Sequence, residues 1–187
     1  MSVEIKSGWR SNSVWLLLSL VILAIDLWTK HLASSSLKLA EPQVFLPYFN
    51  FTLLHNYGAA FSFLSDGGGW QRWFFGVVAF LVSIFLVVWL LRLEANKRRE
   101  AMAIAFILGG AVGNLWDRIS LGYVVDFIDW FYTVDNSAGD GQCLPFFYAR
   151  LGSEISTCHW PAFNIADAAI LFGAFLLILD LLLAPKK

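Results

Sequence analysis

Two aspartates in the second half of the chain, Asp126 and Asp167, have the clearest capacity for chemistry. Each lies in an apolar segment, and neither has an obvious basic neighbour in the sequence. Two carboxylates brought together in a site of low dielectric constant cannot both ionise easily, so the pair shares one proton. An aspartic protease uses such a pair as its acid and its base. We therefore predict that these two residues form a catalytic pair.

Further polar residues lie near the same ends of the apolar segments as the two acids. Asn164 is three residues before Asp167 and shares its helix face. Gly110, Asn114 and Arg118 follow one another in steps of four residues, so one helix face carries all three. This clustering of costly polar groups in one leaflet of a membrane predicts a site rather than a purely structural helix bundle.

Asp26 and Lys30 are four residues apart, which allows them to pair on one helix face. Burying an acid at the centre of a spanning helix costs about 2.5–3.5 kcal/mol on insertion scales. The pair has two interpretations, a structural ion pair that holds the end of the first span and a direct part of the site. Both remain open from the sequence.

Other hydrolytic chemistries find no support in the motifs. The chain has no HExxH helix motif, and its histidines are not at metal-ligand spacing: His31, His55 and His159. It has no GxSxG nucleophile motif and no GxxxxGK[ST] phosphate-binding loop. We therefore expect an enzyme that uses no metal ion and no cofactor.

The composition requires that these residues be positioned by helices in a membrane. Of the 187 residues, 58% are apolar and only 14% are charged, against roughly 45–50% and about 25% in soluble domains. The net charge of −1 provides no basic surface for nucleic acid. The fold class is therefore an all-α membrane protein, a single domain whose four apolar stretches can each span a bilayer, at about 14–33, 70–91, 101–116 and 161–184.

Basic residues beside the spans predict the orientation of the chain. Lys and Arg accumulate before the first span, in the link around 92–99 and at the C-terminus. Such residues favour the cytoplasmic side, so both termini are expected there and the segments 34–69 and 118–160 outside. The remaining segments hold five basic residues, Lys30, Lys38, Arg72, Arg118 and Arg150. A cleavable signal peptide is the alternative for the first stretch, but Asp26 and Lys30 are unusual near a cleavage region.

The external segments have two notable features. Residues 48–53 alternate between apolar and polar types, which predicts a half-buried strand within the segment 44–64. Cys143 and Cys158 both lie in the second external segment. An oxidising exterior favours a disulfide between them, with two free thiols as the alternative.

The motifs together resemble those of a known family, the bacterial lipoprotein signal peptidases (signal peptidase II). The matching segments occur in the family's order across nearly the whole chain: 26–30 (DLWTK), 56–61 (NYGAAF), 109–118 (GGAVGNLWDR), 122–127 (GYVVDF) and 163–167 (FNIAD). One such segment alone would be a weak signal, whereas the ordered set is highly specific.

This resemblance implies a four-helix enzyme with a small extracytoplasmic β-cradle and lid, where the lid is the segment 44–64. It implies that Asp126 and Asp167 are catalytic. The residues that shape the site or support it would be Asn56, Gly110, Asn114, Arg118, Asn164, Asp26 and Lys30. The expected reaction is removal of the signal peptide from diacylglyceryl-modified prolipoproteins, by cleavage before the lipidated Cys. We expect a monomer that contacts membrane lipid in the bacterial inner membrane, with its active site on the outer side.

One departure from the family pattern concerns the two acids, which about forty residues separate in this chain. Family members place them closer together, so residues of roughly 133–157 are an expected insertion in the external loop. Because a long loop adds little closure entropy, the insertion leaves the catalytic pair intact. A transporter that conducts ions along buried charges is the alternative function, but it predicts polar residues at all membrane depths, which the sequence lacks. A structural assembly factor would tolerate the loss of either acid.

Overall fold

The computed structural model of this chain describes residues 12–58, 69–135, 143–150 and 155–183. The basic residues of both termini and residues 59–64 of the expected lid lie outside these ranges. The chain forms two compact units. The first contains Met1–Trp28, Gly76–Ser120 and Ile165–Lys187, and the second contains Thr29–Phe75 and Leu121–Asn164.

Four helices in the described residues are long and apolar enough to span a membrane, as predicted. They are α2 (Val14–Ser36), α3 (Trp70–Arg92), α4 (Arg98–Ser120) and α5 (Ile165–Leu183). Helix α4 extends beyond the predicted span 101–116 at both ends. Its first and last turns are polar, so the apolar run in the sequence did not include them. Helix α5 begins at Ile165 rather than at Pro161, because Phe163 pairs with Ile128 of a strand and is not free to enter the helix.

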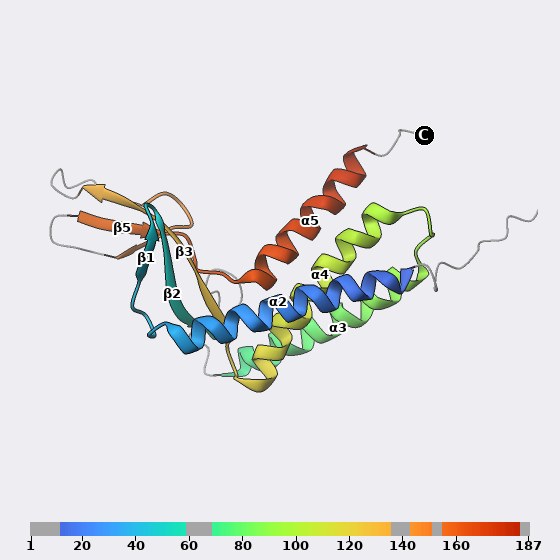
Figure 1. Cartoon of the computed structure of the whole chain (residues 1–187), viewed down its shortest axis with the longest axis horizontal. Helices are drawn as coiled ribbons and strands as arrows, with labels where there is room; N and C mark the ends of the chain where they lie inside the picture. Colours follow the sequence, from blue (N-terminus) through green and yellow to red (C-terminus); the bar gives the residue numbers. More distant parts are fainter. Residues whose placement is uncertain (1–11, 59–68, 136–142, 151–154, 184–187) are drawn as a thin grey trace, which may run out of the picture. The chain divides into compact units, whose positions relative to one another are not determined.

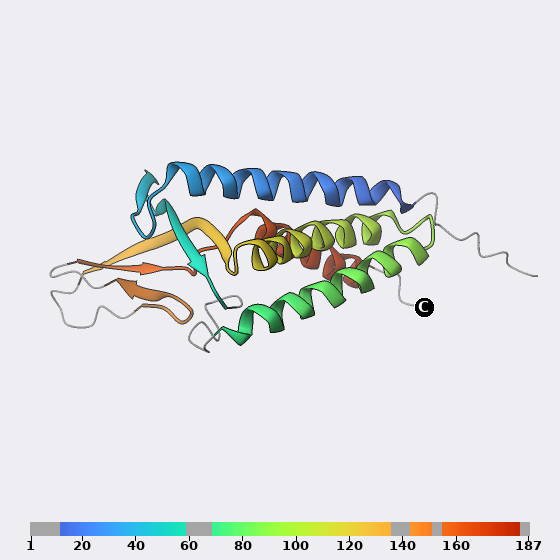
Figure 2. The same ribbon diagram turned by 90° about the horizontal axis from the view of Figure 1, so that it is seen from below.

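Helix α4 is the most buried of the four spans, and both views show it among the other helices of the first unit (Figures 1 and 2). Its buried side chains include Ile104 and Leu108, which join Leu86 and Leu90 of α3 in an apolar core. Burial against neighbouring helices rather than lipid explains why α4 tolerates a lower mean hydropathy than the other three spans.

Glycines on α4 allow close contact with its neighbours. A Cβ added to Gly109 would lie 2.8 Å from the Ser19 carbonyl oxygen of α2. One added to Gly110 would collide with the Ala166 carbonyl oxygen of α5. Glycines of α4 therefore allow close helix packing on two sides of the helix, toward α2 and toward α5.

The second unit contains a five-stranded antiparallel sheet with the order β1-β2-β3-β5-β4. Its first two strands, β1 (Gln43–Leu46) and β2 (Phe49–Asn56), form a hairpin. We predicted one strand in the segment 44–64, and that prediction was incomplete. The chain turns between the two strands at Pro47 and at Tyr48, whose φ of 69° lies in the left-handed region.

Three further strands come from the second external segment: β3 (Val124–Asp135), β4 (Tyr148–Arg150) and β5 (Ile155–His159). Cys143 and Cys158 form a disulfide, so the alternative of two free thiols was wrong. The bridge closes a loop with a sequence separation of 15 residues, and such a closure stabilises a fold by about 3 kcal/mol on the chain-entropy model. The described residues of the expected insertion therefore belong largely to strands of the sheet, and the disulfide cross-links this region to β5.

Candidate active site

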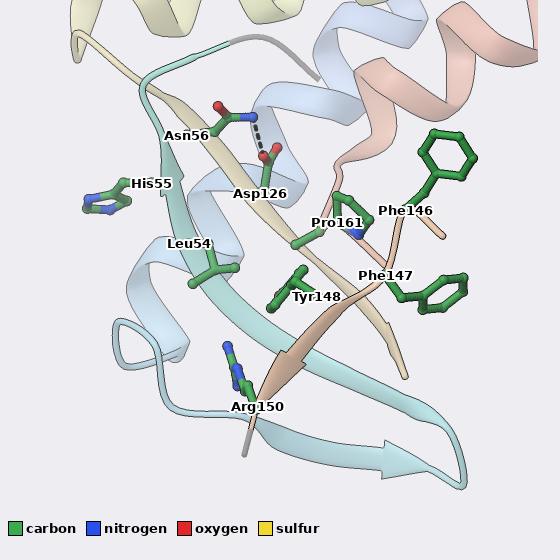
Figure 3. Close-up of a pocket in the computed structure, with 10 residues that line it drawn as sticks. Leu54, His55, Asn56, Asp126, Phe146, Phe147, Tyr148, Arg150 and Pro161 are labelled. Carbon is green, nitrogen blue, oxygen red and sulfur yellow. Dashed lines mark hydrogen bonds between the residues drawn. The ribbon is translucent and has the colours of Figure 1, made fainter. Parts of the chain in front are cut away.

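Asp126 lies near the start of β3 and is 2% exposed. Asn56 Nδ2 donates to its Oδ2 at 3.0 Å, and Asn164 Nδ2 donates to its Oδ1 at 2.7 Å. Figure 3 shows the bond from Asn56. Both carboxyl oxygens thus accept from side-chain amides, which fix the orientation of the group. An oriented carboxyl with little solvent around it is suited to hold or move a proton.

Backbone pairing places both asparagines beside Asp126. Strand β2 pairs with β3 so that Leu54 is opposite Asp126, and Asn56 follows two residues later. The Phe163 carbonyl oxygen accepts from the backbone N–H groups of Phe127 and Ile128, at 3.1 and 2.9 Å. Asn164 is therefore fixed against β3, where its side chain is fully buried.

Asp126 lines a pocket of about 600 Å³ in the second unit. Strand β2 contributes Leu54, His55 and Asn56 to one wall (Figure 3). This volume lies within the range of sites that bind small molecules or short segments of a larger substrate. The pocket gives a buried acid access to a ligand from outside the protein.

Asp167 lies in the first turn of α5, in the first unit. Its Oδ1 accepts from Asn114 Nδ2 of α4 at 2.7 Å. One turn further along α4, Arg118 Nη1 donates to the Asn114 carbonyl oxygen at 3.2 Å. The helix face that the sequence predicted therefore leads to the second acid, and Arg118 lies beside the residue that holds it.

Asp26 has a specific structural contact. Its Oδ1 accepts from the Ala166 backbone N–H at 2.8 Å, and its side chain is fully buried. Because the first N–H groups of a helix have no partner within it, Asp26 caps the start of α5 next to Asp167. Gly113 has no room for a side chain, since a Cβ there would collide with the Asp26 carboxylate. Lys30 is 3% exposed and belongs to the second unit, and its pairing with Asp26 stays a prediction.

Comparison with known proteins decides the family. The family model described as signal peptidase (SPase) II matches residues 18–183. The chain belongs to the signal peptidase II family. It is accordingly a membrane-embedded protease, and the enzyme class that the motifs implied is confirmed.

Individual relatives agree with this family. The lipoprotein signal peptidase of Acinetobacter baumannii is 49% identical over 176 residues, which cover 94% of this chain and 87% of the relative. That of Cellvibrio japonicus is 47% identical over 182 residues, covering 97% and 94%. A solved structure of a bacterial membrane enzyme matches with a TM-score of 0.69 and 27% identity, covering 94% of this chain and 92% of the other. The fold of four long apolar helices with a small antiparallel sheet is thus shared.

This signal peptidase II family member also contains a polar network that the sequence did not reveal. Asp129 is fully buried in β3, and its two oxygens bond to His159 Nδ1 and Thr52 Oγ1, each at 2.7 Å. His159 Nε2 contacts Thr157 Oγ1 at 2.9 Å. The only signal in the sequence was His159 itself, which we had considered only as a metal ligand. Its partner is thirty residues away in the chain.

The network predicts a pH-dependent contribution to stability. Burial alone would raise the pKa of Asp129, but hydrogen bonds from His159 and Thr52 and the charges of His159 and Arg150 more than offset burial and lower it below 3.8. A depressed pKa in the folded state means that the stabilisation is present above the unfolded pKa and is lost as the pH falls through the lower folded value.

Asp129→Asn should therefore lower the free energy of unfolding by about 1–3 kcal/mol at pH 7. The difference from the wild type should shrink as the pH falls below about 4. Thermal unfolding between pH 3 and pH 7 measures it. Glu41→Gln is the control, because Glu41 is an exposed acid in an ion pair with Lys38. A difference that stays constant down to pH 3 would contradict the role of the Asp129 charge.

Proposed function

We propose that this protein removes the signal peptide from prolipoproteins that carry diacylglycerol on their lipobox Cys, and that it cleaves just before that Cys. The single observation that carries the proposal is Asp126, a buried acid that two asparagine amides orient in the wall of a pocket. Membership of the signal peptidase II family supports the substrate class. The names of the similar proteins, lipoprotein signal peptidases, support it as well.

Asp126 and Asp167 are the proposed catalytic pair. Asn164, which bonds directly to Asp126, precedes Asp167 by only three residues. Three residues of chain span at most about 11 Å between Cα atoms. Covalent geometry therefore supports a common site to which each acid brings its own asparagine, Asn164 for Asp126 and Asn114 for Asp167.

The proposed mechanism uses one ionised and one protonated acid. The ionised carboxylate takes a proton from a water molecule, and the water oxygen attacks the scissile carbonyl carbon. The protonated partner donates its proton to the developing oxyanion. When the tetrahedral intermediate collapses, the C–N bond breaks and the leaving amine receives a proton from the acid that had accepted one from water. A hydroxyl of the intermediate returns a proton to the partner acid as the new carbonyl forms, so the pair regains its starting state. Two carboxyls that share one proton supply both roles.

The proposed topology places this chemistry at the outer face of the inner membrane. Four basic residues gather where α3 ends and α4 begins, Arg92, Lys97, Arg98 and Arg99. Such a cluster favours the cytoplasmic side. The opposite ends of the same helices, and the sheet segments between the spans, would then lie outside. We further propose that the protein acts as a monomer that holds the substrate's acyl chains against membrane lipid.

Cleavage of matched precursors tests the proposed substrate. The purified full-length protein is given two identical precursor peptides, one with diacylglycerol on the Cys and one without it. We expect at least about a tenfold higher kcat/KM for the lipidated peptide, because each buried methylene of the acyl chains contributes about 0.8 kcal/mol. Mass spectrometry of the products identifies the cleaved bond. Equal cleavage of both peptides, or cleavage at another bond, would contradict the proposal.

A further inference from the structure

The pocket beside Asp126 has a second wall, which the insertion supplies. Phe146, Phe147, Tyr148 and Arg150 line it from this side. In Figure 3, Arg150 lies at the far end of the pocket from Asp126, and Tyr148 lies between them. The insertion therefore extends the pocket away from the buried acid and ends it with a cation.

This wall is firmly attached to the rest of the sheet. The disulfide between Cys143 and Cys158 connects its start to β5. Strand β4 pairs with β5, where Tyr148 is opposite His159. The two rings also stack, with centroids 5.4 Å apart. His159 is itself held by its bond to the buried Asp129. A binding surface that is fixed before a ligand arrives loses less entropy when it binds.

Apart from Asp126, Arg150 is the residue that brings a charge to the pocket among the described residues that line it. Burial lowers the pKa of His55 below 6.5, so its imidazole is neutral at pH 7. Burial and the charge of Asp129 raise the pKa of Tyr148 above 10.0, although Arg150 partly opposes the shift, so the phenol is neutral as well. Asp129, whose charge also acts on Arg150, already accepts hydrogen bonds on both oxygens from His159 and Thr52.

We propose that Arg150 is a specificity-determining residue that binds an acidic side chain of the substrate, in the first residues after the lipidated Cys. A guanidinium matches a carboxylate with two parallel hydrogen bonds. The neighbouring Tyr148 hydroxyl interacts with Arg150 and can donate to the same carboxylate. This inference rests on the proposed function, and it concerns a residue of the insertion rather than of the family motifs.

The side of the cleaved bond follows from the chemistry of the two halves of the substrate. The signal peptide is apolar and remains in the membrane, where an acidic side chain is costly. The residues after the Cys leave the membrane for the aqueous side. Arg150 is carried by a sheet built from external segments, and it can meet an acidic side chain of the substrate only on that side.

Lipidated precursor peptides of different charge test the role of Arg150. Peptides carry Asp, Asn or Lys in turn at each of the first three positions after the lipidated Cys. At low ionic strength the wild type should process the Asp peptide at one of these positions with about a five- to tenfold higher kcat/KM than the Asn peptide. The preference should decline with added salt.

Variants at position 150 separate charge recognition from general damage. Arg150→Gln should reduce the Asp-to-Asn ratio to about one, Arg150→Lys should restore part of it, and Arg150→Glu should favour the Lys peptide. Lys38→Gln, at an exposed side chain that is not among the residues lining the pocket, should keep both the ratio and the turnover of the wild type. A wild type that cleaves all three peptides equally, or an Arg150→Gln ratio equal to that of the wild type, overturns the inference. A wild type that cleaves none of them overturns the proposed function itself.

Discussion

Asp126→Asn and Asp167→Asn should each lower kcat/KM for a lipidated precursor by at least about a thousandfold, because the amide side chain can neither take a proton from water nor supply one in the required step. The double variant should be about as inactive as either single variant, since residues that act as one unit do not contribute additively. The amide oxygen of an Asn at position 126 can still accept from one of the two asparagines that hold Asp126, Asn56 or Asn164, so substrate binding should change less than turnover.

Each acid has a matched control on its own element. Asp135→Asn changes an exposed acid of β3, the strand that carries Asp126. Asp180→Asn changes an acid of α5 that lies beside residues 96–100 at the start of α4, well along the helix from Asp167. Both controls should retain turnover close to that of the wild type. Thermal unfolding of all four variants checks that they are folded. Near-normal processing by a folded Asp126→Asn or Asp167→Asn would eliminate the catalytic pair.

The spans and the acids could be predicted because their signals are local. A long apolar run is visible in any window of the sequence, and so is an acid within one. Two asparagines near Asp167 could be predicted as well. Helical spacing or the motif pattern indicated both Asn164 and Asn114. The bond between Asn114 and Asp167 joins residues 53 apart in the chain, but each lies on a helix face that the spacing had already indicated.

The remaining contacts depend on pairing between distant segments. Spacing suggested that Asp26 pairs with Lys30, but it gave no sign that Asp26 also caps α5 at a residue 140 positions away. Strands β3 and β5 bring Asp129 to His159 at the two ends of the segment that the sequence indicated only as an inserted loop. No local pattern distinguishes a buried histidine with an acidic partner from an exposed one. The sequence indicated the insertion only as a loop that leaves the catalytic pair intact, while in the structure its described residues form a wall of the pocket.

Gly110 shows how one residue connects helix packing to the site. The sequence placed it on the same α4 face as Asn114, among the supporting residues. In the structure it contacts the backbone of α5 at Ala166, and Asn114, one turn later, bonds to Asp167 of the same helix. The absence of a side chain at position 110 sets the distance between α4 and α5. The contact thus positions the asparagine that holds the second acid.

Gly110→Ala should consequently lower the free energy of unfolding by at least about 3 kcal/mol. The new Cβ would collide with the Ala166 carbonyl oxygen and lie 2.9 Å from Ile170 Cγ1. Trimming Ile170 to Ala should not rescue the variant, because the backbone carbonyl cannot be removed. Gly76→Ala is the control in α3, since nothing lies within 4 Å of a Cβ there, and it should change stability by no more than about 1 kcal/mol. Thermal unfolding in detergent and abundance in membranes measure both variants. Equal stability of the two would show that α4 and α5 do not depend on close contact at Gly110.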